Sequence, residues 1–255
     1  MNKLFGFKKT FSILISFSFI VLNFLFGFAF YIFLKFYLHF SHIFLSRENF
    51  SLIVELSTNL FMLIFLLCII AKKLKIDIKE NICRIREDFF ENILTIISFP
   101  FGFVVLVIIW YYLKIPIFNF KVFESNYLGN IIRNETILWI ALGFINMCIF
   151  VPIKEEIIIR RLLYVSLRRK YNFIVSVFIS GILFSLIHSN FLTSFIYNIV
   201  GCYIYERFGK LNITIFIHAI TNFLLLLIAV IVKILLSNNF FASTCFKVYQ
   251  WGLSL

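Results

Sequence analysis

The sequence predicts an all-α fold: a polytopic membrane helix bundle of about seven transmembrane helices with an amphipathic cytoplasmic helix. Two observations of composition carry this prediction. Of the 255 residues, 62% are hydrophobic and only 14% are charged, and the mean hydropathy of +1.01 lies far outside the range of soluble domains. The third observation is that apolar runs follow one another without a linker rich in Pro, Gly or Ser. Residues 1–255 are therefore expected to form a single integral membrane domain.

The helices follow from apolar runs long enough to cross roughly 30 Å of hydrocarbon. The first run follows a basic start but lacks a small-residue cleavage site, so it is predicted to be a retained helix and not a signal peptide. Residues 72–92 mix basic residues with Ile and Phe at a spacing typical of an amphipathic helix on an anionic inner leaflet. The predicted spans are 11–34, 51–71, 93–113, 136–165, 172–188, 191–206 and 211–236.

The formal charge of +12 is explained by membrane topology. The Lys and Arg residues stand in short blocks between apolar runs, without the aromatic interleaving expected of a nucleic-acid surface, so no nucleic-acid partner is expected. By the positive-inside rule four blocks face the cytoplasm, with the N-terminus inside and the C-terminus outside. The richness in Phe, Ile, Asn and Lys is typical of an AT-rich bacterial gene, which favours a bacterial cytoplasmic membrane. The blocks are Lys3, Lys8 and Lys9; Lys72 to Arg86; Arg168 to Lys170; and Arg207 with Lys210.

Motifs of the common soluble enzymes are missing from the sequence. It has no Walker loop, GxSxG elbow or HExxH pair, and its five cysteines form no CxxC pair. The informative residues are ionisable and polar side chains inside the apolar runs, which mark candidate functional sites. They fall into three short groups.

The first group lies in the predicted helix 136–165 and contains Glu155, Glu156 and Arg160. Pro152 has no N–H to donate to the carbonyl of Cys148, so a bend is expected just before the acids. Glu156 and Arg160 are four residues apart and are predicted to pair, whereas Glu155 points about 100° away from Glu156. Glu155 is therefore the candidate general base.

The second group pairs Phe184 with His188, and the third pairs His218 with Asn222, each four residues apart on one helix face. Polar pairs of this kind can hold helices together, or they can donate hydrogen bonds to a reacting oxygen. Combined with Glu155, they supply what hydrolysis of an amide needs: a carboxylate base, an imidazole and donors for an oxyanion.

As an ordered set, these groups resemble the EExxxR, FxxxH and HxxxN motifs of the CPBP family of intramembrane endopeptidases. That family includes the type II CAAX prenyl proteases and the Abi or bacteriocin-immunity proteins. The resemblance covers about residues 145–230 and implies a catalytic core at about 136–236. The matching segments are Glu155-Glu156-Ile-Ile-Ile-Arg160, Phe184-Ser-Leu-Ile-His188 and His218-Ala-Ile-Thr-Asn222.

The resemblance implies a glutamate-type intramembrane protease that acts on a peptide or protein substrate. Family members commonly have an aromatic residue and a glycine where this chain has Ile159 and Arg161. A prenylated CAAX substrate is not expected from a bacterial gene. The implied roles are Glu155 as base, His188 as its helper, His218 and Asn222 as oxyanion donors, and Glu156 with Arg160 as support.

Other interpretations stay open beside this one. No cofactor is expected, because the sequence has no HExxH-type pair; if zinc is bound, Glu155, His188 and His218 are the expected ligands. The alternative function is a non-catalytic membrane immunity or scaffold protein of the same fold. A proton-coupled transporter is disfavoured, because paired broken helices are missing.

The sequence does not predict that the three groups share one depth in the membrane. Counting ~1.5 Å per residue from the nearest basic block places Glu155 about 20 Å, His188 about 27 Å and His218 about 12 Å along their helices.

Overall fold

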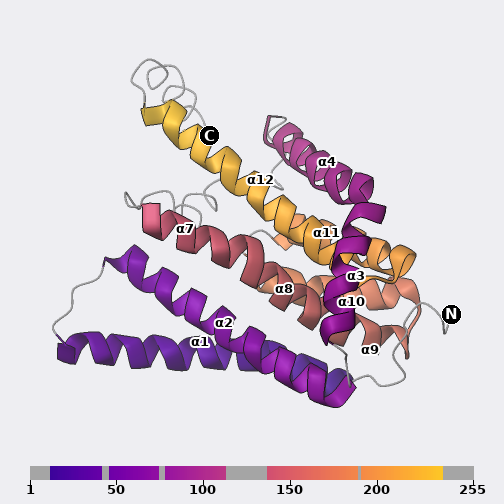
Figure 1. Ribbon diagram of the computed structural model, residues 1–255, viewed down its shortest axis with the longest axis horizontal. Helices are drawn as coiled ribbons and strands as arrows, with labels where there is room; N and C mark the ends of the chain where they lie inside the picture. The colour runs from indigo at the N-terminus through magenta and orange to yellow at the C-terminus, as the bar shows by residue number, and fades with distance from the viewer. Residues whose placement is uncertain (1–11, 42–45, 75–77, 113–136, 189–190, 238–255) are drawn as a thin grey trace.

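The computed structural model of the protein is helical throughout the residues it describes, which are 12–41, 46–74, 78–112, 137–188 and 191–237 (Figure 1). No strand occurs in these ranges, which confirms the all-α prediction. The first basic block and the tail after residue 237 lie outside the described residues, so the N-terminus-inside topology stays a prediction.

Helical stretches coincide with all seven ranges that the hydropathy pattern predicts, and one more helix lies within 72–92. Two of the segments are π-helical and carry the label η. The elements are α1 (Ile13–Ser41), α2 (Arg47–Leu74), α3 (Ile78–Glu91), α4 (Ile93–Tyr112), α7 (Ile137–Ile145), η1 (Asn146–Phe150), α8 (Val151–Glu156), η2 (Ile157–Tyr164), α9 (Val165–Arg168), α10 (Phe173–Leu186), α11 (Phe191–Phe208) and α12 (Leu211–Ser237).

Seven transmembrane spans are not confirmed. Among the described residues three helices are long and apolar enough to cross a membrane, Ile13–Ser41, Asn49–Ile69 and Leu211–Ile228. A fourth span is reached only if Ile85–Glu91 and Ile93–Ile109, bent by 68° from each other, count together. Helix α10 has 14 residues, which at 1.5 Å per residue gives about 21 Å, short of the roughly 30 Å of hydrocarbon.

The site-bearing stretch 137–168 runs through the middle of the bundle (Figure 1). On one side α1 and α2 lie side by side, with α2 against η1 and α8, and α1 against η2. On the other side α12 packs on α8 and η1, and α4 packs on α12. Helices α10 and α11 form a hairpin that reaches η2. Helix α8 is therefore enclosed by segments from both halves of the chain.

Local signals fix the ends of the C-terminal helices. Asn172 caps α10, because its side chain accepts a hydrogen bond from the backbone N–H of Val175. Gly209 ends α11 with a φ of 66°, which favours glycine, and its N–H donates to the carbonyl of Tyr205. The next residue, Lys210, pairs with Asp88 and Glu91 of α3, and these hydrogen bonds raise the pKa of the Lys210 ammonium. The α11–α12 turn is thereby fastened to α3.

Candidate active site

Glu155, His188 and His218 converge on one point, although they come from three different helical segments. The Oε2 atom of Glu155 lies 3.6 Å from Nε2 of His188 and 3.9 Å from Nε2 of His218. Oε2 is buried and accepts no hydrogen bond from the described residues. One carboxylate oxygen therefore faces two imidazole nitrogens at distances slightly beyond a direct hydrogen bond.

The position of His188 follows from the end of α10. The last carbonyls of a helix have no partner within it, and the carbonyl of Phe184 lies 2.7 Å from Nδ1 of His188. Because a carbonyl only accepts, Nδ1 carries a proton and Nε2 is the atom presented to Glu155. The rings of Phe184 and His188 lie 4.2 Å apart, so Phe184 supports the imidazole from one side.

Glu156 faces away from this point and supports His218 from behind. Its Oε1 atom lies 3.0 Å from Nδ1 of His218 and 3.1 Å from Nη1 of Arg160. The predicted pair between Glu156 and Arg160 is therefore present. Because the Glu156 carboxylate accepts the Nδ1 proton, it fixes the imidazole ring so that Nε2 of His218 is the atom presented to Glu155.

Arg160 is fully buried between two aromatic rings. Its Cζ atom lies 5.1 Å from the ring centre of Phe184 and 5.9 Å from that of Tyr197, distances at which a cation and a ring attract each other. A Cβ atom at Gly201 would lie 2.5 Å from Nη2 of Arg160, so this position of α11 has room only for glycine. Tyr197 belongs to none of the three sequence motifs. Its ring also lies 5.3 Å from that of His218.

Asn222 lies one turn beyond His218 and fastens α12 to the π-helical turn η1. Its Nδ2 atom donates a hydrogen bond of 2.9 Å to the carbonyl of Met147. In η1 the N–H of Val151 donates to the carbonyl of Asn146, five residues earlier. In the same register the next donor would be the N–H of Pro152, which proline lacks, and the next acceptor is the carbonyl of Met147. In this π-helical register Pro152 leaves the carbonyl of Met147 without a backbone donor, and Asn222 supplies one. The expected role of Asn222 as an oxyanion donor stays a prediction.

We expect Asn222→Ala to lower the free energy of unfolding by about 1–3 kcal/mol, because the partly buried carbonyl of Met147 loses its donor. In a Pro152→Ala background the loss should be much smaller, since the new backbone N–H can donate to Met147 in the same register. Thermal unfolding in detergent, arranged as a double-mutant cycle, measures the difference. Pro152→Ala alone is the control. Equal losses in both backgrounds would contradict this account of η1.

Lys154 also lies outside the three sequence motifs. It anchors α8 to the α1–α2 hairpin. Its Nζ atom donates to Oδ1 of Asn59 at 2.6 Å and to Oδ1 of Asn23 at 3.3 Å. Asn59 in turn donates to Oδ1 of Asn146 in η1 at 2.9 Å. The sequence feature that could have indicated this network is a single asparagine inside each of the first two apolar runs, Asn23 and Asn59. The network holds a buried ammonium one residue from Glu155.

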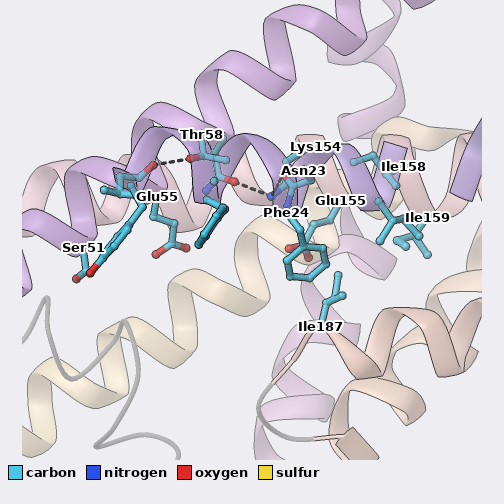
Figure 2. A pocket seen from close by; sticks show the side chains of 16 residues that line it. Asn23, Phe24, Ser51, Glu55, Thr58, Lys154, Glu155, Ile158, Ile159 and Ile187 are labelled. Carbon is cyan, nitrogen blue, oxygen red and sulfur yellow. Dashed lines mark hydrogen bonds between the residues drawn. The ribbon is translucent and has the colours of Figure 1, made fainter. Parts of the chain in front are cut away.

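A cavity of about 540 Å³ opens beside Glu155, between the α1–α2 hairpin and the segments α8 and η2 (Figure 2). Its walls are largely apolar and include Ile20, Phe24 and Phe28 of α1. Lys154 and Glu155 form part of the lining, and Ile187 places the end of α10 at its edge. The carboxylate that meets the two histidines is thus reachable from a space of ligand size.

The three residues expected to hold zinc, Glu155, His188 and His218, are indeed neighbours. Within the ranges that the structure describes, however, no group of three or more His, Cys, Asp or Glu side chains is arranged to hold a metal ion. The expectation of a site without cofactor stays a prediction.

Residues 137–224 match the family model described as Rce1-like, the type II CAAX prenyl endopeptidase. This part of the chain, about a third of its length, is therefore similar to that family. The match includes all three motifs and extends from α7 into α12, while α1 to α4 lie outside it. No curated protein and no solved structure matches the chain. Together with the apolar helices, this similarity indicates an integral membrane protein and points to an enzyme of the CAAX protease type.

The two departures from the common CAAX protease pattern are both buried in η2. Ile159 is 1% exposed, and Arg161 is 6% exposed. Ile159 lines the cavity beside Glu155, whereas Arg161 is not part of that lining. Arg161, the charged residue at a position where the family commonly has glycine, therefore does not line the cavity beside Glu155.

Proposed function

We propose that this protein is an intramembrane endopeptidase in which Glu155 activates water for attack on a peptide bond. The observation that carries the proposal is the buried Oε2 atom of Glu155, facing Nε2 of His188 at 3.6 Å and Nε2 of His218 at 3.9 Å. Gaps of this length between polar atoms suit a bridging water. The cavity at Glu155 gives a peptide access to that point.

In the proposed reaction Glu155 takes a proton from the water as its oxygen bonds to the carbonyl carbon of the substrate. His188 helps to hold the water, because its Nδ1 atom is committed to the Phe184 carbonyl and its Nε2 atom is the free one. When the C–N bond breaks, the proton passes to the leaving amine. The products are a carboxylic acid and an amine, as in any amide hydrolysis.

The negative oxygen of the intermediate needs donors, and His218 is the first candidate. Its hydrogen bond to Glu156 orients the ring so that Nε2 faces the reacting point, where the Nε2–H of the protonated ring would stabilise the oxyanion. Asn222 contributes through its second amide N–H, while the first holds η1 in place. Glu156 and Arg160 support the site without touching the substrate. No metal takes part, so activity is expected to survive treatment with EDTA.

Protein turnover profiling in cells tests the proposal and finds the substrate in the same experiment. Cells carrying the wild type are compared with cells carrying Glu155→Ala at equal expression. We expect one or more membrane or secreted proteins to accumulate uncleaved only with Glu155→Ala. Identical profiles, together with a preserved cellular phenotype, would sink the endopeptidase and favour the immunity or scaffold protein.

A further inference from the structure

We infer that the cavity beside Glu155 selects substrates that carry a positively charged group, and that Glu55 on α2 is the residue that recognises it. The inference rests on the proposed endopeptidase function, because it takes the cavity as the place where the substrate lies. It adds a specificity-determining residue and a chemical class of substrate, a peptide with a Lys, an Arg or a free amino group near the cleaved bond.

Glu55 is an unexpected residue for its position. It lies in the candidate span Asn49–Ile69, where an ionisable group is costly unless it has a partner or a function. Its side chain lines the cavity, and the charged groups that act on its carboxylate among the described residues are Lys154, which attracts it, and Glu155, which repels it. Figure 2 shows its carboxylate turned toward the same open space as that of Glu155.

The charges that line the cavity favour a cation over an anion. They are two carboxylates, Glu55 and Glu155, and one ammonium, Lys154. The Lys154 ammonium already donates to Asn59 and Asn23, so an anionic ligand would have to compete with these hydrogen bonds. A positively charged group on the substrate would therefore balance the second carboxylate of the cavity in its apolar surroundings.

The aromatic part of the cavity lining suits a basic side chain. Phe24 and Phe28 of α1 line the same cavity as Glu55. Aromatic faces attract cations and also pack against the methylene stem of Lys or Arg. The cavity volume of about 540 Å³ holds a few residues of a peptide.

The distance along α2 limits where the charge must stand in the substrate. Glu55 precedes Asn59, the partner of Lys154, by one helical turn, which is about 6 Å of rise. An extended peptide covers about 3.3 Å per residue. With the reach of a long side chain, the basic group is expected within about three residues of the cleaved bond.

Cleavage of a randomised peptide library by the full chain in lipid nanodiscs tests this inference. We expect the wild type to favour Lys or Arg at one position near the cleaved bond. Glu55→Gln should cut the preference for Lys over norleucine at that position by about tenfold or more. Thr58→Val, an uncharged change of the same cavity wall, is the matched control and should keep the preference. Cleavage without a basic preference, or with an acidic one, would overturn the inference while the endopeptidase stands.

A binding arm separates this inference from the proposed reaction. Affinity selection from the same library uses the Glu155→Gln protein, with and without Glu55→Gln. Enrichment of basic peptides that depends on Glu55 supports the inference even if the wild type cleaves nothing, in which case only the endopeptidase fails. Equal recovery of basic and neutral peptides on both proteins would overturn it.

Discussion

Glu155→Gln is expected to lower kcat for peptide-bond cleavage by about a thousandfold, with KM changed by less than about threefold. A positioned general base contributes about 10² to 10⁴ in rate, and the glutamine keeps the size of the side chain but cannot take a proton. The rates are measured on purified protein with the substrate found by turnover profiling. The melting temperature should stay close to that of the wild type, because Oε2 of Glu155 has no hydrogen bond to lose within the described residues.

The neighbouring Glu156→Gln is the matched control, since it makes the same chemical change one residue along the helix. It removes the negative partner of the buried Arg160 and of His218, so it should lower the melting temperature strongly. Any loss of activity should follow the loss of folded protein and of the Glu156 contact that orients His218. If Glu155→Gln retained full activity, or if the two variants behaved alike, the assignment of Glu155 as base would be wrong.

Patterns that repeat along one helix were predictable from the sequence. Apolar runs located the helices, because burial in a membrane requires continuous apolar stretches. The pair Glu156 and Arg160 followed from the spacing of four residues, which brings side chains together on any helix. The motifs also chose Glu155 and His188 correctly as neighbours.

Features that depend on contacts between helices were not predictable in the same way. Counting depth from the basic blocks separated Glu155 from His188 and His218, because it treats each helix as a straight rod along the membrane normal. The structure brings them together through the short α10 and the two π-helical turns around α8. The seven-span count is not confirmed, since helical apolar stretches need not cross a membrane.

The Lys154 network and Glu55 were missed because each polar residue is isolated in the sequence. Asn23, Asn59 and Asn146 stand in three different apolar runs, and only the packing of α1, α2 and η1 brings them to Lys154 or to one another. Glu55 likewise gains meaning only beside the cavity that α1 closes. A polar residue inside an apolar run signals a site, but its partner comes from the fold.

Arg160→Met is expected to lower the free energy of unfolding by about 3–5 kcal/mol, the largest stability change in the site. Arg160 is 0% exposed, and removing its charge leaves the buried carboxylate of Glu156 with His218 as its ion-pair partner among the described residues. Methionine retains much of the length of the side chain, so the loss reports the charge more than a cavity. Denaturant or thermal unfolding in detergent measures it.

Two further variants separate charge from packing around Arg160. Adding Glu156→Gln to Arg160→Met should recover part of the lost stability, because the unpaired buried carboxylate is removed. Gly201→Ala should cost about 1–3 kcal/mol in the wild type, where the new Cβ atom would lie 2.5 Å from Nη2 of Arg160. In the Arg160→Met background the same alanine should cost much less, because the rigid guanidinium is gone. If Gly201→Ala were equally harmful in both backgrounds, glycine would be needed there for another reason. If Glu156→Gln gave no recovery, Arg160 would stabilise the site mainly by packing between Phe184 and Tyr197.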